Sequence, residues 1–242
     1  MSPEKTGALY GVGVGPGDPG LLTIRAAEIL GLVDVVLTAS ASANEDSLAA
    51  KIAAPHLRTE VPCRKLPFPM TSDLEVLERA WDENAAIVAG ILRSGKSAAF
   101  LTLGDCLTYS TYAYLLRHLK KAMPEARIES VPGIASYQLA AARLNRPLVL
   151  GRETLAVLGG AADNDQMEAL LENADNLAIL KSYRETPALL KRLGELGLLS
   201  RSALCVNLAL PGEAIFDDLS LERPAPPGSY FTLTLVNKRP KE

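Results

Sequence analysis

The chain has 242 residues, of which 48% are hydrophobic and 22% charged, and its formal net charge is −3. This composition excludes a disordered or collagen-like chain, and an acidic balance without a long basic run disfavours a nucleic-acid partner. Three scattered cysteines and two distant histidines offer no ligand spacing, so we expect no metal. Because no apolar run reaches the roughly 20 residues that span a bilayer and no signal-peptide pattern is present, we expect a cytoplasmic protein without a membrane partner.

Strand and helix patterns alternate through the first half of the chain. A helix is predicted over residues 23–31, with Thr23 as its N-cap and Gly31 as its stop. Another helix is predicted over residues 110–123. Apolar runs that predict strands occupy residues 7–15, 34–39, 97–103 and 127–131.

The clearest helix is predicted over residues 72–95. Ser72 and Glu75 match a capping box, and Gly95 marks the end. Apolar residues recur at spacings of three and four, which indicates one apolar stripe. The stripe consists of Leu74, Leu77, Trp81, Ala85, Val88 and Leu92.

A second α/β series follows the sequence VPGIAS near residue 131. Its helix is predicted over residues 185–197, with Thr186 as N-cap, Pro187 in the first turn and Gly197 at the stop. Its strands are predicted at residues 153–158, 176–180, 202–210 and 230–236. The simplest organisation is therefore two α/β domains, at residues 1–132 and 133–242.

A glycine-rich stretch, GVGVGPGDPG, follows the first predicted strand. It does not match the dinucleotide fingerprint G-x-G-x-x-G, because Pro16 and Asp18 stand where the third glycine is needed. Pro16 has no N–H to donate, and Asp18 would place a negative charge beside a pyrophosphate. Four glycines and two prolines exceed the needs of a turn, so we interpret the loop as a rigid support for a neutral or cationic small molecule.

Three stretches, GVGVGPGDPGLLTIRA, FLTLGDCLTYSTYAYL and VPGIASYQLAA, resemble the signature blocks of the tetrapyrrole methylases, the class III S-adenosylmethionine-dependent methyltransferases. LPFPMTSD at residues 66–73 resembles the branch that methylates carbon 20 of precorrin-2 or cobalt-factor II. The resemblance covers the chain from about Tyr10 to Val236. It implies two α/β domains with mixed sheets flanked by helices, an active-site cleft between them, S-adenosylmethionine as methyl donor, a tetrapyrrole substrate and a homodimer.

The resemblance also implies a set of cofactor-binding residues, which contact the cofactor mostly through backbone groups. Alternatives remain open for Asp105 as a turn residue, Ser136 as a helix cap and Lys181 as a solvated strand end. No catalytic residue is assigned. The cofactor set is Pro16, Gly104, Asp105, Thr108, Ala135, Ser136, Lys181, Leu208, Ala209 and Thr232. Candidates for the substrate's carboxylates are Arg64, Lys65, Arg143, Arg146, Arg152 and Arg184.

One departure is Cys106, which stands where the family usually has the proline of Gly-Asp-Pro; we interpret it as a small hydrophobe and not a nucleophile. The alternatives are a methylase that acts on another macrocycle carbon, on diphthine or on RNA, an NAD(P) oxidoreductase, and a non-catalytic tetrapyrrole carrier. The sequence offers no ligand that decides between a metal-free and a cobalt-containing substrate.

Overall fold

The computed structural model describes residues 6–41, 46–160, 164–221 and 228–238. The chain forms two compact units, Met1–Ala135 and Ser136–Glu242. The boundary between the two units in the sequence lies a few residues after the one that the sequence suggested, between residues 132 and 133.

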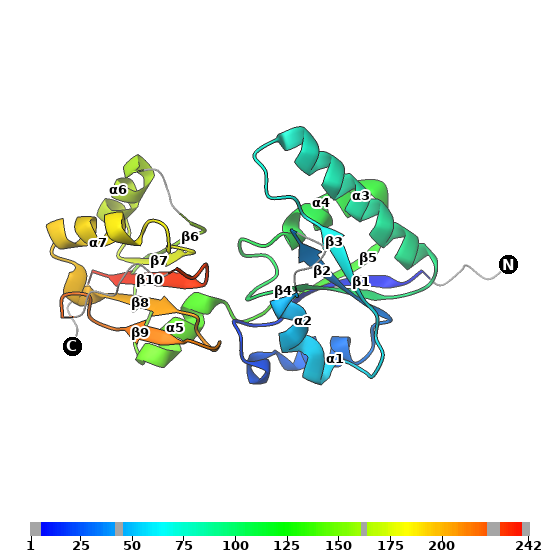
Figure 1. Ribbon diagram of the computed structural model, residues 1–242, viewed down its shortest axis with the longest axis horizontal. Coiled ribbons are helices and arrows are strands. Elements are labelled where there is room, and N and C mark those ends of the chain that lie inside the picture. Colours follow the sequence, from blue (N-terminus) through cyan, green and yellow to red (C-terminus); the bar gives the residue numbers. More distant parts are fainter. Residues whose placement is uncertain (1–5, 42–45, 161–163, 222–227, 239–242) are drawn as a thin grey trace. The chain divides into compact units, whose positions relative to one another are not determined.

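The N-terminal unit contains a five-stranded sheet in the order β3-β2-β4-β1-β5 (Figure 1), and every pairing among its described strands is parallel. The strands are β1 (Ala8–Gly13), β2 (Val35–Ser40), β3 (Cys63–Pro67), β4 (Ala98–Thr102) and β5 (Arg127–Val131). The helices are α1 (Ile24–Leu30), α2 (Leu48–Ala53), α3 (Leu74–Arg93) and α4 (Tyr112–Ala122), with short 3-10 turns η1 (Pro19–Leu21) and η2 (Ala54–His56).

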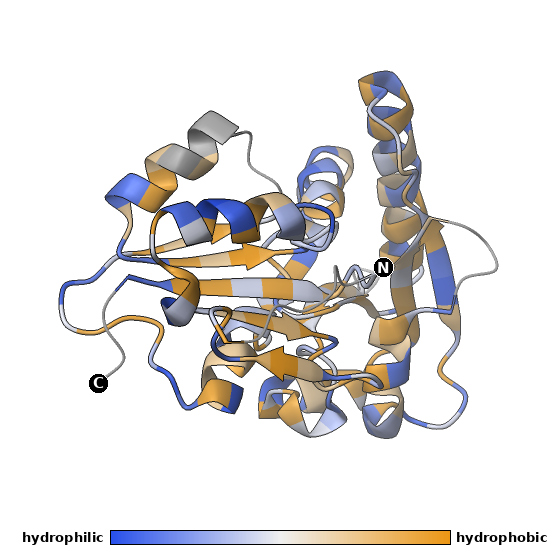
Figure 2. Cartoon of the chain, turned by 60° about the vertical axis from the view of Figure 1, so that its left-hand side comes forward, coloured by the Kyte–Doolittle hydropathy of each residue, from blue (hydrophilic) through white to orange (hydrophobic). Residues whose placement is uncertain are grey.

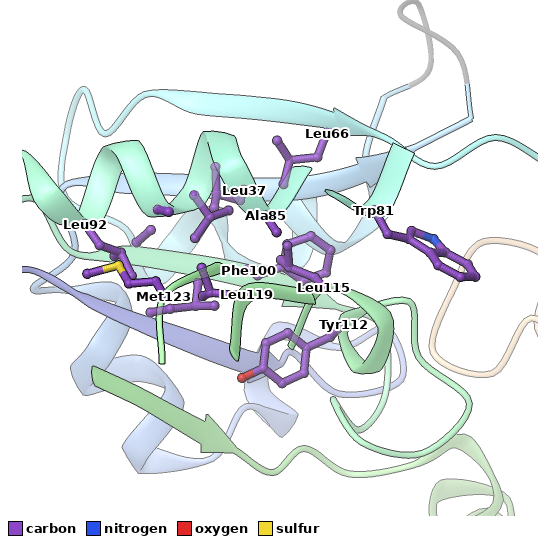
Figure 3. Close-up of a cluster of buried hydrophobic side chains, with 14 of the residues drawn as sticks. Leu37, Leu66, Trp81, Ala85, Leu92, Phe100, Tyr112, Leu115, Leu119 and Met123 are labelled. Carbon is purple, nitrogen blue, oxygen red and sulfur yellow. The ribbon is translucent and has the colours of Figure 1, made fainter. Parts of the chain in front are cut away.

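Side chains of the central strands alternate between two hydrophobic clusters, one on each face of this sheet. Leu9 of β1 and Phe100 of β4 pack with residues of α3 and α4 (Figure 3). Val12 and Leu101, on the same two strands, pack with residues of α1 and α2 on the opposite face. This period of two explains why β1 and β4 read as almost continuous apolar runs, as expected of parallel strands that are covered on both faces.

Helix α3 confirms the predicted element, but its start differs. Asp73, not Ser72, is the N-cap, because its carboxylate accepts hydrogen bonds from the N–H groups of Glu75 and Val76. The predicted capping box is therefore wrong. The apolar stripe is buried from Trp81 onward, whereas its first member, Leu74, is 63% exposed in the first turn.

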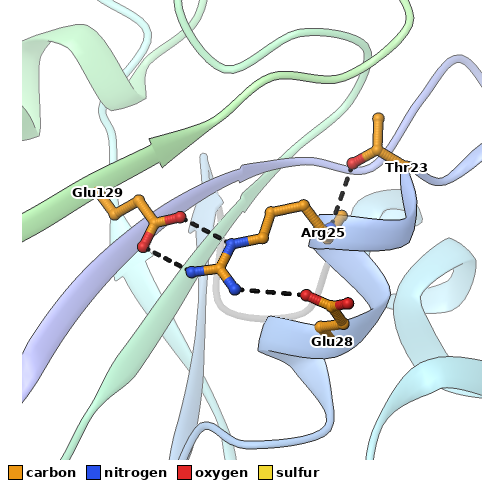
Figure 4. A network of polar contacts seen from close by, with 5 residues as sticks. Thr23, Arg25, Glu28 and Glu129 are labelled. Atoms are coloured by element: carbon orange, nitrogen blue, oxygen red, sulfur yellow. Dashed lines mark hydrogen bonds and ion pairs between the residues drawn. The ribbon is translucent and has the colours of Figure 1, made fainter.

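Helix α1 begins and ends where the sequence predicts. The Thr23 hydroxyl accepts a hydrogen bond from the N–H of Ala26, and Gly31 is the C-cap. Arg25 on this helix donates two hydrogen bonds to Glu129 of β5 and contacts Glu28 (Figure 4). These bonds hold the pKa of Glu129 below its usual range, but the pair is exposed and therefore screened by solvent.

The C-terminal unit contains a five-stranded mixed sheet in the order β6-β7-β10-β8-β9, with parallel pairing of β6 and β7 and antiparallel pairing elsewhere among its described strands. Figure 2 shows its strands as mainly hydrophobic. The strands are β6 (Leu155–Leu158), β7 (Asn176–Leu180), β8 (Ser202–Val206), β9 (Ala214–Phe216) and β10 (Thr232–Asn237). The helices are α5 (Ser136–Leu144), α6 (Asn164–Asn173) and α7 (Thr186–Glu195), with the 3-10 turn η3 (Leu199–Arg201).

Helices α6 and α7 contribute to one core cluster with β6, β7 and β10, and α5 contacts β10. The prediction that Thr186 is the N-cap of α7 is wrong. Thr186 is the first helical residue, and its hydroxyl instead donates to the carbonyl of Ser182. Pro187 lies in the first turn as predicted, and Gly197, with φ of 66°, follows the C-cap.

The predicted fold class, two α/β domains whose sheets are flanked by helices, is confirmed. The prediction of mixed sheets holds for the C-terminal unit, whereas the described pairings of the N-terminal sheet are all parallel. The sequence analysis missed β3, α2, α6 and β9. Strand β3 was missed because it lies at an edge and only Leu66 among its residues is buried, which removes the apolar signal. The strand predicted over residues 202–210 ends at Val206. None of the helices in the described part of the chain combines the length and apolar composition needed to cross a membrane.

Candidate cofactor-binding site

Strands β1 and β4 are neighbours in the N-terminal sheet but lead to opposite faces. The chain leaves β1 toward α1 on one face and leaves β4 toward α4 on the other. The register pairs Gly13 with Thr102, so the two strands end at the same level. In open α/β sheets, ligands bind outside the carboxyl ends of the strands where neighbouring connections diverge in this way. This edge is therefore the candidate site of the unit.

The loops that follow β1 and β4 are joined to each other through their backbones. Gly15 and Gly104 exchange two N–H to carbonyl hydrogen bonds, of 3.2 and 2.7 Å. Their φ values are 79° and 71°, a left-handed conformation that glycine adopts without a steric penalty. Pro16 follows directly and is buried. The structure thus places predicted residues Pro16 and Gly104 on two connected loops.

The backbone of the loop after β5 packs directly against the backbone of the same two loops. A Cβ atom built on Gly133 would lie 2.3 Å from the carbonyl oxygen of Gly104, and one built on Gly13 would lie 2.6 Å from that oxygen. Side chains are excluded at both positions. Three loops from β1, β4 and β5 therefore meet through glycines, which is why this edge consists largely of backbone groups.

The carboxylate of Asp105 connects the second loop to the third. One oxygen accepts hydrogen bonds from the N–H of Leu107 and the hydroxyl of Thr108, both 2.9 Å long. The other oxygen accepts from the N–H of Gly133 at 3.1 Å. Asp105 and Thr108 thus lie together at this edge, and both side chains are engaged in shaping the loops. Of the two roles that the sequence left open for Asp105, the structure shows the turn role.

Cys106 occupies the position after Asp105 and is fully buried. Its thiol approaches the carbonyl oxygen of Val131 at 3.3 Å, and burial raises its pKa to about 11. A thiol with a raised pKa is protonated at neutral pH and is a poor nucleophile. The observation supports the interpretation of Cys106 as a small packed residue.

Asp18 in the first loop serves a local role. Its carboxylate accepts a hydrogen bond of 2.8 Å from the N–H of Gly20 and caps the η1 turn. The negative charge at this position stays incompatible with a bound pyrophosphate.

Ala135 and Ser136 lie at the start of α5, directly after the loop of Gly133. Ala135 is buried, and the space around Gly104 includes Ala135 and Ile134. No acidic residue occupies the first turn of α5. Because the first N–H groups of a helix have no partner within it, this turn favours an anionic group.

The remaining predicted residues gather at one edge of the C-terminal sheet. Strands β7 and β8 end where β10 begins, and the Ser182 N–H donates to the carbonyl of Thr232 while the Asn207 N–H donates to that of Phe231. Lys181 therefore lies beside Thr232, and Leu208 and Ala209 follow in the loop after β8. These four residues, distant in the sequence, are brought together by the antiparallel pairing of β10.

The backbone is strained at this edge. Lys181, Asn207 and Ala209 have φ values of 57°, 50° and 58°, although none of them is a glycine. Such left-handed residues persist only where the surroundings enforce them, and they concentrate at ligand-binding sites.

An exposed aromatic residue accompanies Lys181 and was missed by the sequence analysis. The Lys181 Nζ atom lies 5.2 Å from the centre of the Tyr230 ring, which packs edge-on against Tyr183. Tyr230 is 45% exposed. No sequence signal indicates this contact, since it depends on the pairing of β7 with β10.

The cations proposed for the substrate's carboxylates have different surroundings. Arg64 and Lys65 are exposed on edge strand β3, and Arg152 is also exposed. Arg143 pairs with Glu213, and Arg146 donates to the carbonyl of Asp217. Arg184 lies over the Tyr183 ring. Arg143 and Arg146 thus have partners within their own unit.

Among the described residues, no group of three or more histidine, cysteine, aspartate or glutamate side chains is arranged to hold a metal ion.

The N-terminal unit has a parallel sheet with a candidate ligand site at the carboxyl ends of β1 and β4. The C-terminal unit has a mixed sheet with strained residues after β7 and β8. These features are typical of a two-unit α/β protein that binds a small molecule. The family model of the Tetrapyrrole (Corrin/Porphyrin) Methylases matches residues 8–222. The chain belongs to this family.

Two relatives from the same family extend over almost the whole chain. A cobalt-precorrin-2 C(20)-methyltransferase of Salmonella typhimurium is 35% identical, covering 96% of this chain and 97% of its own. A precorrin-2 C(20)-methyltransferase of a Sinorhizobium species is 31% identical, covering 98% and 97%. Among solved structures, a uroporphyrin-III C-methyltransferase of Thermus thermophilus, in complex with S-adenosylhomocysteine, has a TM-score of 0.62 at 22% identity, covering 96% of this chain and 98% of its own. That likeness establishes the same fold.

Proposed function

We propose that this protein transfers a methyl group from S-adenosylmethionine to carbon 20 of precorrin-2 or its cobalt complex, a step of corrin-ring formation in cobalamin biosynthesis. The observation that carries the proposal is the near full-length similarity to two chains that are both named as C(20)-methyltransferases. The segment LPFPMTSD, which runs from the end of β3 to the N-cap of α3, supports the same branch.

The residues present fit S-adenosylmethionine by the chemistry of their donor sets. The first turn of α5 offers N–H groups and no acidic side chain, which suits the carboxylate of the methionine part. The glycine loops offer backbone carbonyl groups, which suit a cationic sulfur. Ala209, which is half-buried beside the buried Leu208, offers apolar surface for an adenine ring. When bound, S-adenosylmethionine would supply a methyl group activated by its sulfonium; transfer of that methyl to an electron-rich carbon would release S-adenosylhomocysteine and would need no covalent enzyme intermediate.

The task of the chain's residues is binding and orientation. The Gly15–Gly104 bridge and the three hydrogen bonds to Asp105 fix the loops of the N-terminal unit before any ligand arrives. Orientation of two reactants in a fixed site is worth several kcal/mol of the barrier. We therefore assign Pro16, Gly104, Asp105, Thr108, Ala135 and Ser136, together with Lys181, Leu208, Ala209 and Thr232, to the cofactor site. No proton acceptor is assigned.

The cytoplasmic location and the homodimer expected from the sequence stay predictions, and each has a direct measurement. Fractionation of cells that express the protein locates it. Light scattering of the purified protein gives its mass.

The decisive experiment is an anaerobic assay with S-adenosylmethionine carrying a ¹³C-labelled methyl group, offered with precorrin-2 or with its cobalt complex. We expect the product to gain one methyl group by mass, and the ¹³C spectrum to place it on carbon 20. The preferred substrate assigns the metal-free or the cobalt route.

Three outcomes would contradict the proposal. A label on another carbon would make the protein a methylase of different regiochemistry. Binding of both ligands without methyl transfer would indicate a tetrapyrrole carrier. Saturable binding of a nicotinamide cofactor in place of S-adenosylhomocysteine would favour an oxidoreductase.

A further inference from the structure

We propose that Glu213 is a positioning residue for the cofactor: its carboxylate, oriented by Arg143, holds the loop of Leu208 and Ala209 in its binding shape. The inference rests on the proposed function, because the assignment of Leu208 and Ala209 to the adenosyl side belongs to it. Nothing in the sequence motifs singles out Glu213, since it lies after the loop and outside every signature block.

The loop at residues 207–213 connects β8 to β9 and has an unfavourable backbone. Asn207 and Ala209 both adopt left-handed φ values, and Gly212 has a φ of 80°. An alanine gains no side-chain hydrogen bond that compensates for this conformation, so a contact from elsewhere must maintain it. Leu208 between the two strained residues is buried, and backbone hydrogen bonds from Leu210 to Asn207 and from Glu213 to Leu210 hold other parts of the loop, but none of these contacts involves Ala209.

The carboxylate of Glu213 supplies that contact. Its Oε2 atom accepts a hydrogen bond of 2.6 Å from the N–H of Ala209, the residue with left-handed φ. A short bond from an N–H to a carboxylate is charge-assisted and stronger than a bond to a neutral acceptor. The bond closes the loop on itself and fixes the direction in which Ala209 presents its backbone.

Arg143 orients this carboxylate through the other oxygen. The Nε atom of Arg143 lies 3.3 Å from Oε1 of Glu213. Arg143 is in the last turn of α5, whose first residue is Ser136. The pair thus connects two segments of the C-terminal unit that the proposed function assigns to one cofactor, the helix that starts at Ser136 and the loop of Ala209.

The same geometry revises the role of Arg143. The sequence made it a candidate for the substrate's carboxylates, but its guanidinium is already paired with Glu213. We therefore expect its removal to change cofactor affinity and not the affinity for the tetrapyrrole.

The test measures the Kd of S-adenosylhomocysteine by titration calorimetry for the full-length protein and its variants. We expect Glu213→Ala to weaken binding about tenfold, and Glu213→Gln, which keeps an acceptor but loses the charge, to weaken it about threefold. Arg143→Ala should resemble Glu213→Gln, and the double variant Glu213→Ala/Arg143→Ala should bind no more weakly than Glu213→Ala alone, because Arg143 acts through the Glu213 carboxylate. At saturating S-adenosylmethionine, kcat should stay within about twofold of the wild type.

The matched control is Glu195→Ala. Glu195 forms an exposed ion pair with Arg192 on α7, in the same unit, with a distance of 3.1 Å between Oε2 and Nη1. This ion pair is not part of the loop at residues 207–213. This variant should keep the wild-type Kd. Circular dichroism and thermal unfolding of every variant separate a loss of binding from a loss of structure.

The outcomes distinguish the inference from the function on which it rests. Wild-type affinity in both Glu213 variants, or a lowered melting temperature with an unchanged Kd, would overturn the positioning role and leave the proposed function intact. An Arg143→Ala variant with a raised KM for the tetrapyrrole and an unchanged cofactor Kd would return Arg143 to the substrate. Failure of the wild-type protein to bind S-adenosylhomocysteine would overturn both.

Discussion

At the residue scale, the polar side chains of the candidate site act mainly on the chain itself. Asp105 accepts three hydrogen bonds from its own loop and from Gly133, and Glu213 holds Ala209. We therefore expect the cofactor contacts to be made mostly by backbone groups, with the side chains holding those groups in position. The effect of a substitution depends on which loop connection it removes.

The first prediction concerns Asp105→Ala. The change removes the acceptor of the Gly133 and Leu107 N–H groups and of the Thr108 hydroxyl, so the second and third loops lose their connection. We expect the Kd of S-adenosylhomocysteine to rise at least about tenfold, since hydrogen bonds to a carboxylate are worth roughly 1.5–3 kcal/mol. Titration calorimetry measures it.

Asp34→Ala is the matched control. The Asp34 carboxylate accepts a hydrogen bond of 2.8 Å from the N–H of Ser97, the residue before β4. This bond therefore lies at the amino ends of the strands, away from the candidate site. The Asp34→Ala variant should have a lower free energy of unfolding and an unchanged cofactor affinity. Equal losses of affinity in the two variants would contradict a specific role for Asp105.

At the element scale, the site results from the order of strands. The helices that follow the neighbouring strands β1 and β4 pack on opposite faces of the sheet. The glycine loops therefore occupy the space at the carboxyl ends of these strands. Glycine is required where loops touch through their backbones, which makes Gly133 a steric determinant of the edge.

The second prediction compares two glycines. Gly133→Ala would place a Cβ atom 2.3 Å from the Gly104 carbonyl oxygen, and backbone must move to relieve the clash. We expect the free energy of unfolding to fall by about 1–3 kcal/mol, together with cofactor affinity. Denaturant unfolding and calorimetry measure the two effects.

Gly90→Ala is the control for this comparison. Gly90 is exposed within α3 and nothing lies within 4 Å of an added Cβ atom. Alanine there should raise stability by about 1 kcal/mol through helix propensity. A Gly133→Ala variant as stable and as tight-binding as Gly90→Ala would disprove the close loop packing.

At the scale of the whole molecule, the family assignment predicts which small molecule stabilises the fold. A ligand that binds only the native state adds a free energy of RT ln(1 + [L]/Kd), about 2.7 kcal/mol at 100 times Kd. We expect S-adenosylhomocysteine at that concentration to raise the melting temperature by about 5–10 °C. NAD⁺ at the same concentration should leave it unchanged, because Asp18 and Pro16 disfavour a pyrophosphate. A shift with NAD⁺ alone would contradict the family's chemistry in this chain.

The sequence by itself determined the α/β class, the central strands, the caps of α1 and the signature loops, because each depends on a local pattern of apolar residues, glycines or capping groups. It failed for β3, where an edge strand carries few buried residues, and at the start of α3, where Asp73 caps the helix in place of the neighbouring Ser72. It also failed at the start of α7, where no side chain caps the helix and the Thr186 hydroxyl donates to the Ser182 carbonyl.

Only the tertiary structure decided which residues meet. The connection of Asp105 to Gly133, the placement of Lys181 beside Thr232 and the ion pair between Arg143 and Glu213 all join segments that lie far apart in the sequence, so they depend on how the elements of each unit pair and pack. The physical reason is that a hydrogen bond between loops requires two strands to end at the same level. That register is set by packing across the whole sheet and leaves no trace in the spacing of the residues along the chain.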